Sequence, residues 1–267
     1  MVTNELVSSV LALAQRAGDA IMTTYNRGDA TVTEKDDRSP LTEADLASHR
    51  VIVAGLEDLP SSGGPRLPVL SEEARAMPYD VRRTWQRFWL VDPLDGTKEF
   101  IKRNGEFTVN IALVESGAPV LGVVHAPVLG RTYFATAAGG AFRRDGDTVR
   151  RISVAARAPT IEIVASRSHG SAETEEFLKR FGADHAIHLV AIGSSLKLCL
   201  VAEGVAHLYP RFGPTMEWDT AAAQCIVEAA GGRVTDLEAH PLIYNKENLL
   251  NPHFVVAVPE VEWRTYL

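Results

Sequence analysis

Short segments that alternate apolar and polar residues fill the chain from residue 88 to residue 152. In the clearest of them, apolar residues occupy every second position from Phe107 to Leu113, which is the period of a β-strand. Gly-Gly and Asp-Gly pairs separate later segments, as turns between neighbouring strands do. The pattern predicts a large antiparallel meander with strands at 88–91, 107–113, 120–124, 131–135, 141–144 and 148–152.

Helical periodicity flanks this region on both sides. From residue 4 to residue 26, apolar side chains recur every three or four positions, and Gly28 ends the pattern. A second helix is expected from Thr42, which can cap it, to about Leu59. After Pro159 the chain alternates strands at 161–165, 187–190, 206–209 and 254–258 with helices at 172–181, 194–203 and 218–230. We expect two halves, 1–155 with paired helices and the antiparallel sheet, and 156–267 with a layered α/β pattern.

The charge of the chain disfavours some classes of partner. It has 27 Lys and Arg residues against 34 Asp and Glu residues, a net charge of -7, so binding to a nucleic acid polymer is not expected. No apolar run approaches the roughly 20 residues that span a bilayer, so no transmembrane segment is expected, and the N-terminus lacks a signal-peptide pattern. We expect the two cysteines to be free thiols in a reducing compartment. We expect a cytoplasmic monomer or homodimer, with peripheral attachment to the inner face of the membrane left open.

Two carboxylates follow the apolar run at 88–91 and are separated by a proline. Pro93 fixes φ and has no N–H, so a sharp turn is expected that lets Asp92, Asp95 and the Leu94 carbonyl face one point. Hard oxygen ligands of this kind suit Mg²⁺. The backbone amides at 96–97, where a short helix begins, offer a seat for phosphate. Standing alone, this segment is explained at least as well by a solvated acidic turn.

Three further carboxylates also have ordinary explanations when each is taken alone. Glu72 ends an apolar run, as the exit of a strand into a loop does. Asp219 opens a predicted helix, and Asp45 can form a capping box with Thr42. Only the combination of all these segments favours a functional site.

Taken together, the segments resemble the inositol monophosphatase superfamily of metal-dependent phosphatases over nearly the whole chain. Its markers occur here in order, at Asp45, at the Glu pair 72–73, at 92–97 and at 218–222. The stretches 92–111, 208–214 and 248–252 look closer still to the CysQ-type 3'(2'),5'-bisphosphate nucleotidases. Ser71 stands where a Gly usually precedes the Glu pair, and we interpret this departure as a mark of that branch.

The resemblance implies an α+β fold, an inositol monophosphatase-like layered αβαβα sandwich, with Mg²⁺ bound between the halves. It implies that Asp92 bridges two Mg²⁺ ions. Glu72 and the Leu94 carbonyl would complete one site, and Asp95 and Asp219 the other. Two such cations neutralise a phosphate and activate a bound water, so no covalent nucleophile is needed. Inhibition by Li⁺ is expected as in the family.

Catalytic and recognition roles are implied in the same way. Thr97 and Glu72 would orient and deprotonate the attacking water, while Asp45 holds the Thr97 hydroxyl. The implied substrate is 3'-phosphoadenosine 5'-phosphate, a small nucleotide bisphosphate that would be hydrolysed to AMP and phosphate. The residues implied to bind it are Gly96, Thr97, His169, Ser194, Lys197, Arg211 and Asp219.

Other functions are compatible with some of the same residues. An inositol monophosphatase or a sugar bisphosphatase with the same metals is the nearest alternative, and a Mg²⁺-binding protein without catalysis is another. The Ser-x-x-Lys at 194–197 also occurs in serine acyl-transferases, but the Ser-Asp-Asn and Lys-Thr-Gly motifs of that class are absent from the sequence. His185 and His188 have no partner pattern for zinc.

Overall fold

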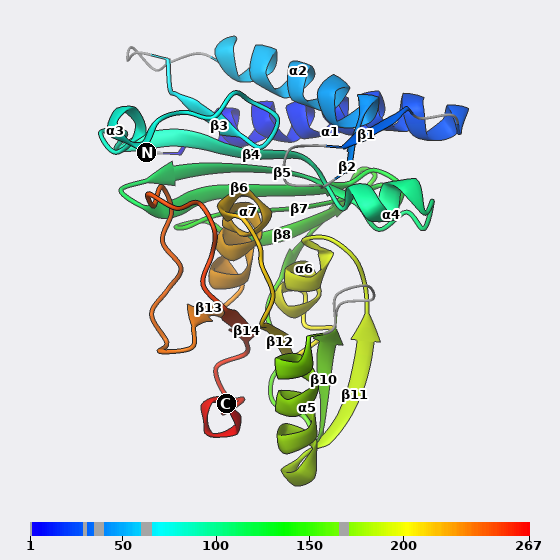
Figure 1. Ribbon diagram of the computed structural model, residues 1–267, viewed down its shortest axis with the longest axis vertical. Helices are drawn as coiled ribbons and strands as arrows, with labels where there is room; N and C mark the ends of the chain where they lie inside the picture. Colours follow the sequence, from blue (N-terminus) through cyan, green and yellow to red (C-terminus); the bar gives the residue numbers. More distant parts are fainter. Residues whose placement is uncertain (1, 29–30, 35–39, 60–65, 166–170) are drawn as a thin grey trace.

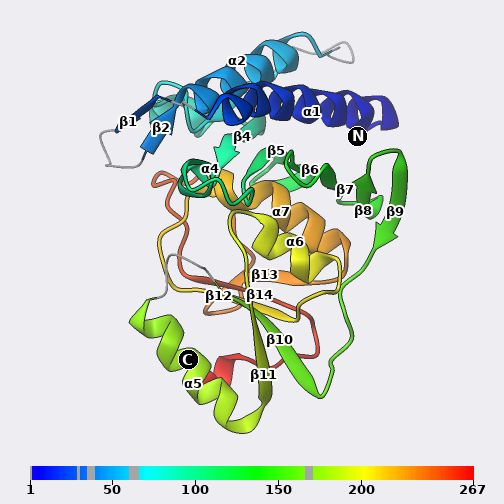
Figure 2. The same ribbon diagram turned by 90° about the vertical axis from the view of Figure 1, so that its right-hand side faces the viewer.

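Five layers make up the part of the chain that the structure describes. The computed structural model describes residues 2–28, 31–34, 40–59, 66–165 and 171–267. Figure 1 shows a helix pair above a seven-stranded sheet, and below them a second helix pair and a five-stranded sheet. Figure 2 shows a further helix on the outer side of the smaller sheet. The expected α+β fold, a layered αβαβα sandwich, is confirmed.

The outermost helix pair consists of α1 (Asn4–Arg27) and α2 (Glu43–Glu57). The Thr3 hydroxyl caps α1 by accepting a hydrogen bond from the Leu6 N–H at 3.2 Å, and Gly28 ends the helix in the left-handed conformation. Thr42 caps α2, as expected. The apolar stripe of α1 lies on the large sheet and is fully or almost fully buried at Val10, Leu13, Ala14, Ala17 and Ile21.

The large sheet follows chain order and confirms the predicted meander. Its strand β3 runs parallel to β4, and all its other neighbouring strands are antiparallel. Both faces are covered, so every residue from 108 to 114 is buried, polar Thr108 and Asn110 included. The strands are β3 (Val69–Ser71), β4 (Arg87–Asp95), β5 (Thr108–Glu115), β6 (Ala118–Ala126), β7 (Arg131–Thr136), β8 (Gly140–Asp145) and β9 (Thr148–Ile152).

The sharp turn expected at Pro93 is wrong, because β4 continues through the proline. Asp92 pairs with Asn110 and Asp95 pairs with Thr108, so β4 has one residue more than its partner between these two pairs. This is a β-bulge, which bends a strand and re-aims its side chains. A proline is tolerated there because the bulge interrupts the regular ladder of hydrogen bonds.

The inner helix pair connects the large sheet to the rest of the molecule. It consists of α6 (Leu196–Ala202) and α7 (Glu217–Ala229). Helix α7 lies close against β6, where a Cβ atom at Gly122 would come within 2.1 Å of the Ala222 carbonyl oxygen. One cluster of buried apolar side chains therefore runs from the large sheet through α7 into the smaller sheet.

The smaller sheet has the strand order β11, β10, β12, β14, β13. Its strands are β10 (Thr160–Ala165), β11 (Ala186–Ala191), β12 (Leu208–Arg211), β13 (Arg233–Asp236) and β14 (Phe254–Ala257). Helix α5 (Ala172–Asp184) covers its outer side, and the Arg180 guanidinium donates to the carbonyl of the C-terminal Leu267 at 2.9 Å. The shorter elements are β1 (Val32–Glu34), β2 (Pro40–Thr42), α3 (Tyr79–Arg82), α4 (Thr97–Ile101) and a 3-10 turn at Arg264–Tyr266. Among the described residues, no helix is both long and apolar enough to span a membrane.

Candidate active site

A cavity of about 550 Å³ lies between the large sheet and the inner helix pair. Its wall is formed by the ends of β3 and β4, the start of α4, the loop before α6, the end of β12 and the start of α7. Asp45 reaches the cavity indirectly, through Thr97, and His169 lies outside the described residues. The predicted site residues that line the cavity are Glu72, Asp92, Leu94, Asp95, Gly96, Thr97, Ser194, Lys197, Arg211 and Asp219.

Three carboxylates from three separate elements meet in this cavity. One oxygen each of Glu72, Asp92 and Asp219 lies within 4.8 Å of the other two. Glu72 follows β3 and its N–H donates to the Val91 carbonyl of β4 at 3.1 Å, which fixes it beside Asp92. Asp219 lies in the first turn of α7, where one of its oxygens accepts from the Met216 N–H at 2.8 Å.

The electrostatics of the cluster favour a bound cation. Burial, followed by the neighbouring Glu72 and Asp95, raises the pKa of Asp92 well above its ordinary range. Burial and the same two neighbours also raise the pKa of Asp219. Like charges gathered away from water are unfavourable unless a counter-charge neutralises them. The donors are all carboxylate oxygens, the set that a hard divalent cation such as Mg²⁺ takes, so the residues present fit such an ion.

Asp95 and Leu94 lie beside this cluster without being part of it. Asp95 lines the same cavity, but its carboxylate is not among the three that meet within 4.8 Å. Its Oδ2 accepts a hydrogen bond from the Ser195 N–H at 2.6 Å. Leu94 is buried, and its carbonyl oxygen lies 3.4 Å from the Thr97 hydroxyl.

The Thr97 hydroxyl is oriented by a buried carboxylate. It donates to Asp45 Oδ1 at 3.1 Å, and Asp45 Oδ2 accepts from both the N–H and the hydroxyl of Thr42 at 2.8 and 2.6 Å. Asp45 therefore caps α2 and fixes Thr97 at the same time. Gly96, with φ 96°, turns the chain into α4 so that Thr97 faces the cavity.

Two cationic side chains, on α6 and at the end of β12, also line the cavity. Burial lowers the pKa of Lys197, opposed by Asp95, and the Lys197 Nζ lies 5.9 Å from the centre of the Tyr209 ring. Arg211 donates from Nη2 to the Pro214 carbonyl at 2.9 Å, while its buried Nε has no hydrogen-bond partner among the described residues. Ser194, which precedes α6, also lines the cavity. Its backbone adopts the left-handed conformation, with φ 48°.

Two polar residues of the site were not predicted from the sequence. Ser195 lies between Asp95 and the Asp219 main chain, and Asn110 on β5 donates to the Ser195 hydroxyl at 2.8 Å. The available signal was Asn110 itself, a polar residue within an apolar strand. Its partner is 85 residues away in the chain, so no local pattern could identify it.

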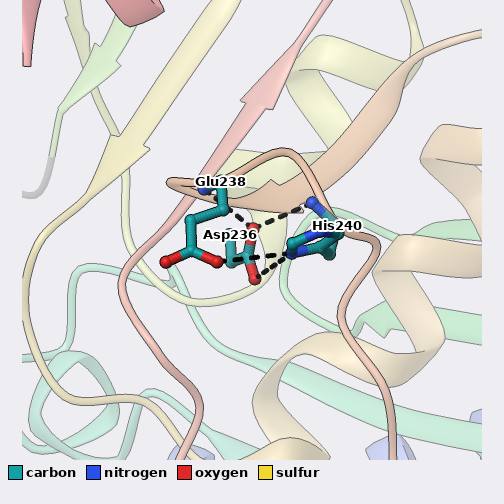
Figure 3. Close-up of side chains that lie close together, drawn as sticks. All are labelled: Asp236, Glu238 and His240. Carbon is teal, nitrogen blue, oxygen red and sulfur yellow. Dashed lines mark hydrogen bonds and ion pairs between the residues drawn. The ribbon is translucent and has the colours of Figure 1, made fainter.

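A second group of potential metal ligands lies on the surface after β13. Figure 3 shows Asp236, Glu238 and His240 around a tight turn. Asp236 Oδ1 accepts from the N–H groups of Glu238 and His240, both at 2.9 Å, so this carboxylate closes the turn. The Glu238 and His240 side chains are 82% and 70% exposed. We interpret this group as turn structure.

Comparison with known proteins agrees with the fold. The family model described as "Inositol monophosphatase family" matches residues 3–262. The chain belongs to this family of phosphatases. Membership, together with the carboxylate cluster, implies a divalent metal ion.

Individual members of the family are similar to the chain over nearly its whole length. The 3'(2'),5'-bisphosphate nucleotidase CysQ of Escherichia coli (strain K12) is 51% identical over 255 residues, which are 95% of this chain and 100% of that protein. The crystal structure of CysQ from Bacteroides thetaiotaomicron has a TM-score of 0.84 and 45% identity, and the match covers 95% of this chain and 97% of that one. An inositol monophosphatase of Thermotoga maritima has a TM-score of 0.76 and 27% identity, covering 95% and 92%.

Proposed function

We propose that the protein is a Mg²⁺-dependent 3'(2'),5'-bisphosphate nucleotidase that converts 3'-phosphoadenosine 5'-phosphate to AMP and phosphate. The similarity to CysQ proteins along nearly the whole chain supports this class of small phosphorylated substrate. The observation that carries the proposal is the cavity itself. It brings the three-carboxylate cluster within one enclosure with Lys197 and Arg211, so a cation-bound phosphate and a second phosphate can be held together.

The metal ligands would be Glu72, Asp92, the Leu94 carbonyl, Asp95 and Asp219. Bound Mg²⁺ would neutralise the phosphate and lower the pKa of a ligated water. Most of these ligands belong to the half at 1–155, whereas Asp219, His169, Ser194, Lys197 and Arg211 belong to the half at 156–267. We propose that the reaction takes place where the two halves meet.

Glu72, Thr97 and Asp45 would activate the attacking water. The Thr97 hydroxyl gives its proton to the hydrogen bond with Asp45, so the Thr97 oxygen is available to accept a hydrogen bond from water. Glu72, at the end of β3, would accept the proton that this water loses as it attacks phosphorus. As the new P–O bond forms, the bond from phosphorus to the ribose 3'-oxygen would break, and that oxygen would take a proton from solvent to leave as the ribose hydroxyl.

The residues that line the cavity near α6 and β12 would recognise the substrate. Lys197 and Arg211 would pair with the second phosphate, and the unpartnered Arg211 Nε is a donor available for it. Ser194 and the amides of Gly96 and Thr97 would contact the phosphate that is removed. His169 keeps its proposed recognition role by resemblance.

The alternative is an inositol monophosphatase or sugar bisphosphatase, and the likeness to the Thermotoga maritima enzyme keeps it open. Phosphate release with Mg²⁺ should be compared for 3'-phosphoadenosine 5'-phosphate, inositol 1-phosphate and a sugar bisphosphate. The nucleotide should give the highest kcat/KM. Equal or faster turnover of inositol 1-phosphate would contradict the nucleotide assignment.

The proposal extends to the compartment and assembly of the enzyme. Cys199 and Cys225 are buried free thiols, as a reducing cytoplasm allows, and we propose a cytoplasmic enzyme on this basis. A monomer or homodimer is proposed for its assembly.

A further inference from the structure

Ser195 joins two of the candidate metal-binding segments through a single hydroxyl group. The residue is 1% exposed and immediately precedes α6. Its main-chain N–H donates to Asp95 Oδ2 at 2.6 Å, and its Oγ lies 2.8 Å from the same oxygen. The same Oγ lies 2.7 Å from the main-chain carbonyl oxygen of Asp219 in α7.

The large sheet supplies a fixed donor to this hydroxyl. Asn110 Nδ2 donates to Ser195 Oγ at 2.8 Å and lies 3.5 Å from Asp95 Oδ2. The Thr108 hydroxyl donates to Asn110 Oδ1 at 3.0 Å, which sets the Asn110 amide with its nitrogen toward Ser195. Thr108 and Asn110 are the two residues that flank the β4 bulge on β5, so the bulge and the hydroxyl form one unit.

The pattern of these bonds leaves one side of the Asp95 carboxylate for the cavity. Every hydrogen bond that Asp95 makes with the described residues falls on Oδ2. Because these bonds fix the Asp95 side chain in one conformation, Oδ1 remains available as a ligand oxygen. A carboxylate whose position is set before the cation arrives binds it with a smaller loss of side-chain entropy.

We propose that Ser195, supported by Asn110, is a positioning residue for the metal site. It fixes Asp95 with Oδ1 toward the cation and ties the first turn of α7, which bears Asp219, to the β4 bulge. This inference rests on the proposed function, because it takes Asp95 and Asp219 as ligands. In this role Ser195 acts through Asp95 and Asp219 and is not itself a ligand.

The test measures Mg²⁺ binding directly, by titration calorimetry on the full chain without substrate. Ser195→Ala removes the hydroxyl but keeps the N–H, so Mg²⁺ affinity should fall by about tenfold, the loss of one hydrogen bond to a charged group. Asn110→Ala should give a loss of the same kind. Because Asn110 acts through Ser195, the double variant should bind Mg²⁺ about as well as Ser195→Ala alone.

Steady-state kinetics give a second readout. Saturating Mg²⁺ should restore most of the kcat of Ser195→Ala and leave the KM for substrate near the wild-type value, because Lys197 and Arg211 are untouched. Thr132→Val is the matched control. Its buried hydroxyl contacts His125 at 2.9 Å and does not line the cavity, so Mg²⁺ affinity should not change.

The outcomes separate this inference from the proposed function. Asp95→Asn serves as the reference for loss of a ligand. If Asp95→Asn loses Mg²⁺ affinity and both Ser195→Ala and Asn110→Ala bind like wild type, the positioning role is wrong and the proposed function stands. A wild-type chain that binds no Mg²⁺ overturns the proposed function and this inference with it. If Ser195→Ala does not fold by circular dichroism, Asn110→Ala decides alone.

Discussion

Asp45 is a capping residue that also contacts Thr97, a residue of the candidate site. One of its oxygens closes the capping box of α2, and the other receives the Thr97 hydroxyl. The helix cap holds the carboxylate still, and the carboxylate in turn holds Thr97. The ordinary structural reading of Asp45 is therefore correct and does not compete with a role in catalysis.

Asp92→Asn should abolish turnover while the chain still folds. The substitution removes a carboxylate oxygen that we propose as a metal ligand, and one buried charge from among like charges. Because burial of that charge is unfavourable, the melting temperature without metal should not fall. Phosphate release and thermal melting of the same sample check both statements. Near-normal activity at ordinary Mg²⁺ would contradict the proposed role of Asp92 as a metal ligand.

Arg211→Ala should mainly raise KM. A charge-assisted contact made equally in the ground and transition states contributes to binding and leaves kcat nearly unchanged. We expect a rise of about 10- to 100-fold, equivalent to about 1.5–3 kcal/mol, for the 3',5'-bisphosphate. With a simple monophosphate the penalty should shrink. An equal penalty for both substrates would make Arg211 structural.

Thr97→Ala should mainly lower kcat, in contrast to Arg211→Ala. The hydroxyl held by Asp45 matters most as water attacks, so its loss should lower kcat by about 100-fold or more and change KM little. Steady-state kinetics beside Arg211→Ala provide the comparison. A rise in KM alone would place Thr97 in substrate binding.

At the scale of elements, local sequence pattern identified the long segments and failed at the short ones around the site. The strand at 148–152 was predicted to the residue because the Asp-Gly turn at 145–146 that precedes it is a local signal. Strand β13 was missed because four residues with one buried apolar side chain give no period. Helix α6 begins at Leu196 and not at Ser194, because Ser194 adopts a positive φ and Ser195 precedes the first turn.

The residues of the candidate site also divide into those with a local signal and those without one. The carboxylates of the cavity were predicted because the family motifs hold them in fixed local contexts. Asn110 and Ser195 were missed because their meaning depends on contacts across 85 residues, and the bulge at Pro93 depends on the register of two strands. Tertiary pairing decides such features, and a single sequence does not display it.

The contact of α1 with β6 should make stability depend on pH. His125 lies under α1, where a Cβ at Gly18 would come within 2.6 Å of its ring, and burial lowers the pKa of His125 to about 4 from an ordinary 6.5. Above pH 6.5 the imidazole is neutral in both states. Between pH 6.5 and 4 only the unfolded chain takes up the proton, so the free energy of unfolding falls, by about 2 kcal/mol at pH 5.

His125→Asn isolates this contribution. The variant keeps a polar group near the Thr132 hydroxyl and cannot be protonated. Urea unfolding of both proteins at pH 8 and pH 5 should show a smaller loss of stability in the variant. Equal losses would mean that His125 is not buried as a neutral imidazole in solution.

At the scale of the whole molecule, the cavity is where the large sheet and the inner helix pair share charged groups. Glu72 follows β3 and Asp92 lies on β4, whereas Asp219 lies on α7. Repulsion among these carboxylates opposes the packing of α7 against β4 and β5. A bound cation reverses the sign of that contribution, so we expect metal binding to stabilise the entire fold.

Mg²⁺ should therefore raise the melting temperature of the chain in the absence of substrate. At a concentration 100-fold above Kd, one bound ion adds about 2.7 kcal/mol to the free energy of unfolding. For a protein of this size, 1 kcal/mol shifts Tm by about 2–4 °C, so a rise of about 5–10 °C is expected. A chelator should reverse it, and KCl of equal ionic strength should not reproduce it. Asp219→Asn should reduce the rise, because it removes the ligand that α7 contributes. If this variant responds to Mg²⁺ as the wild type does, the cation does not bind between the halves.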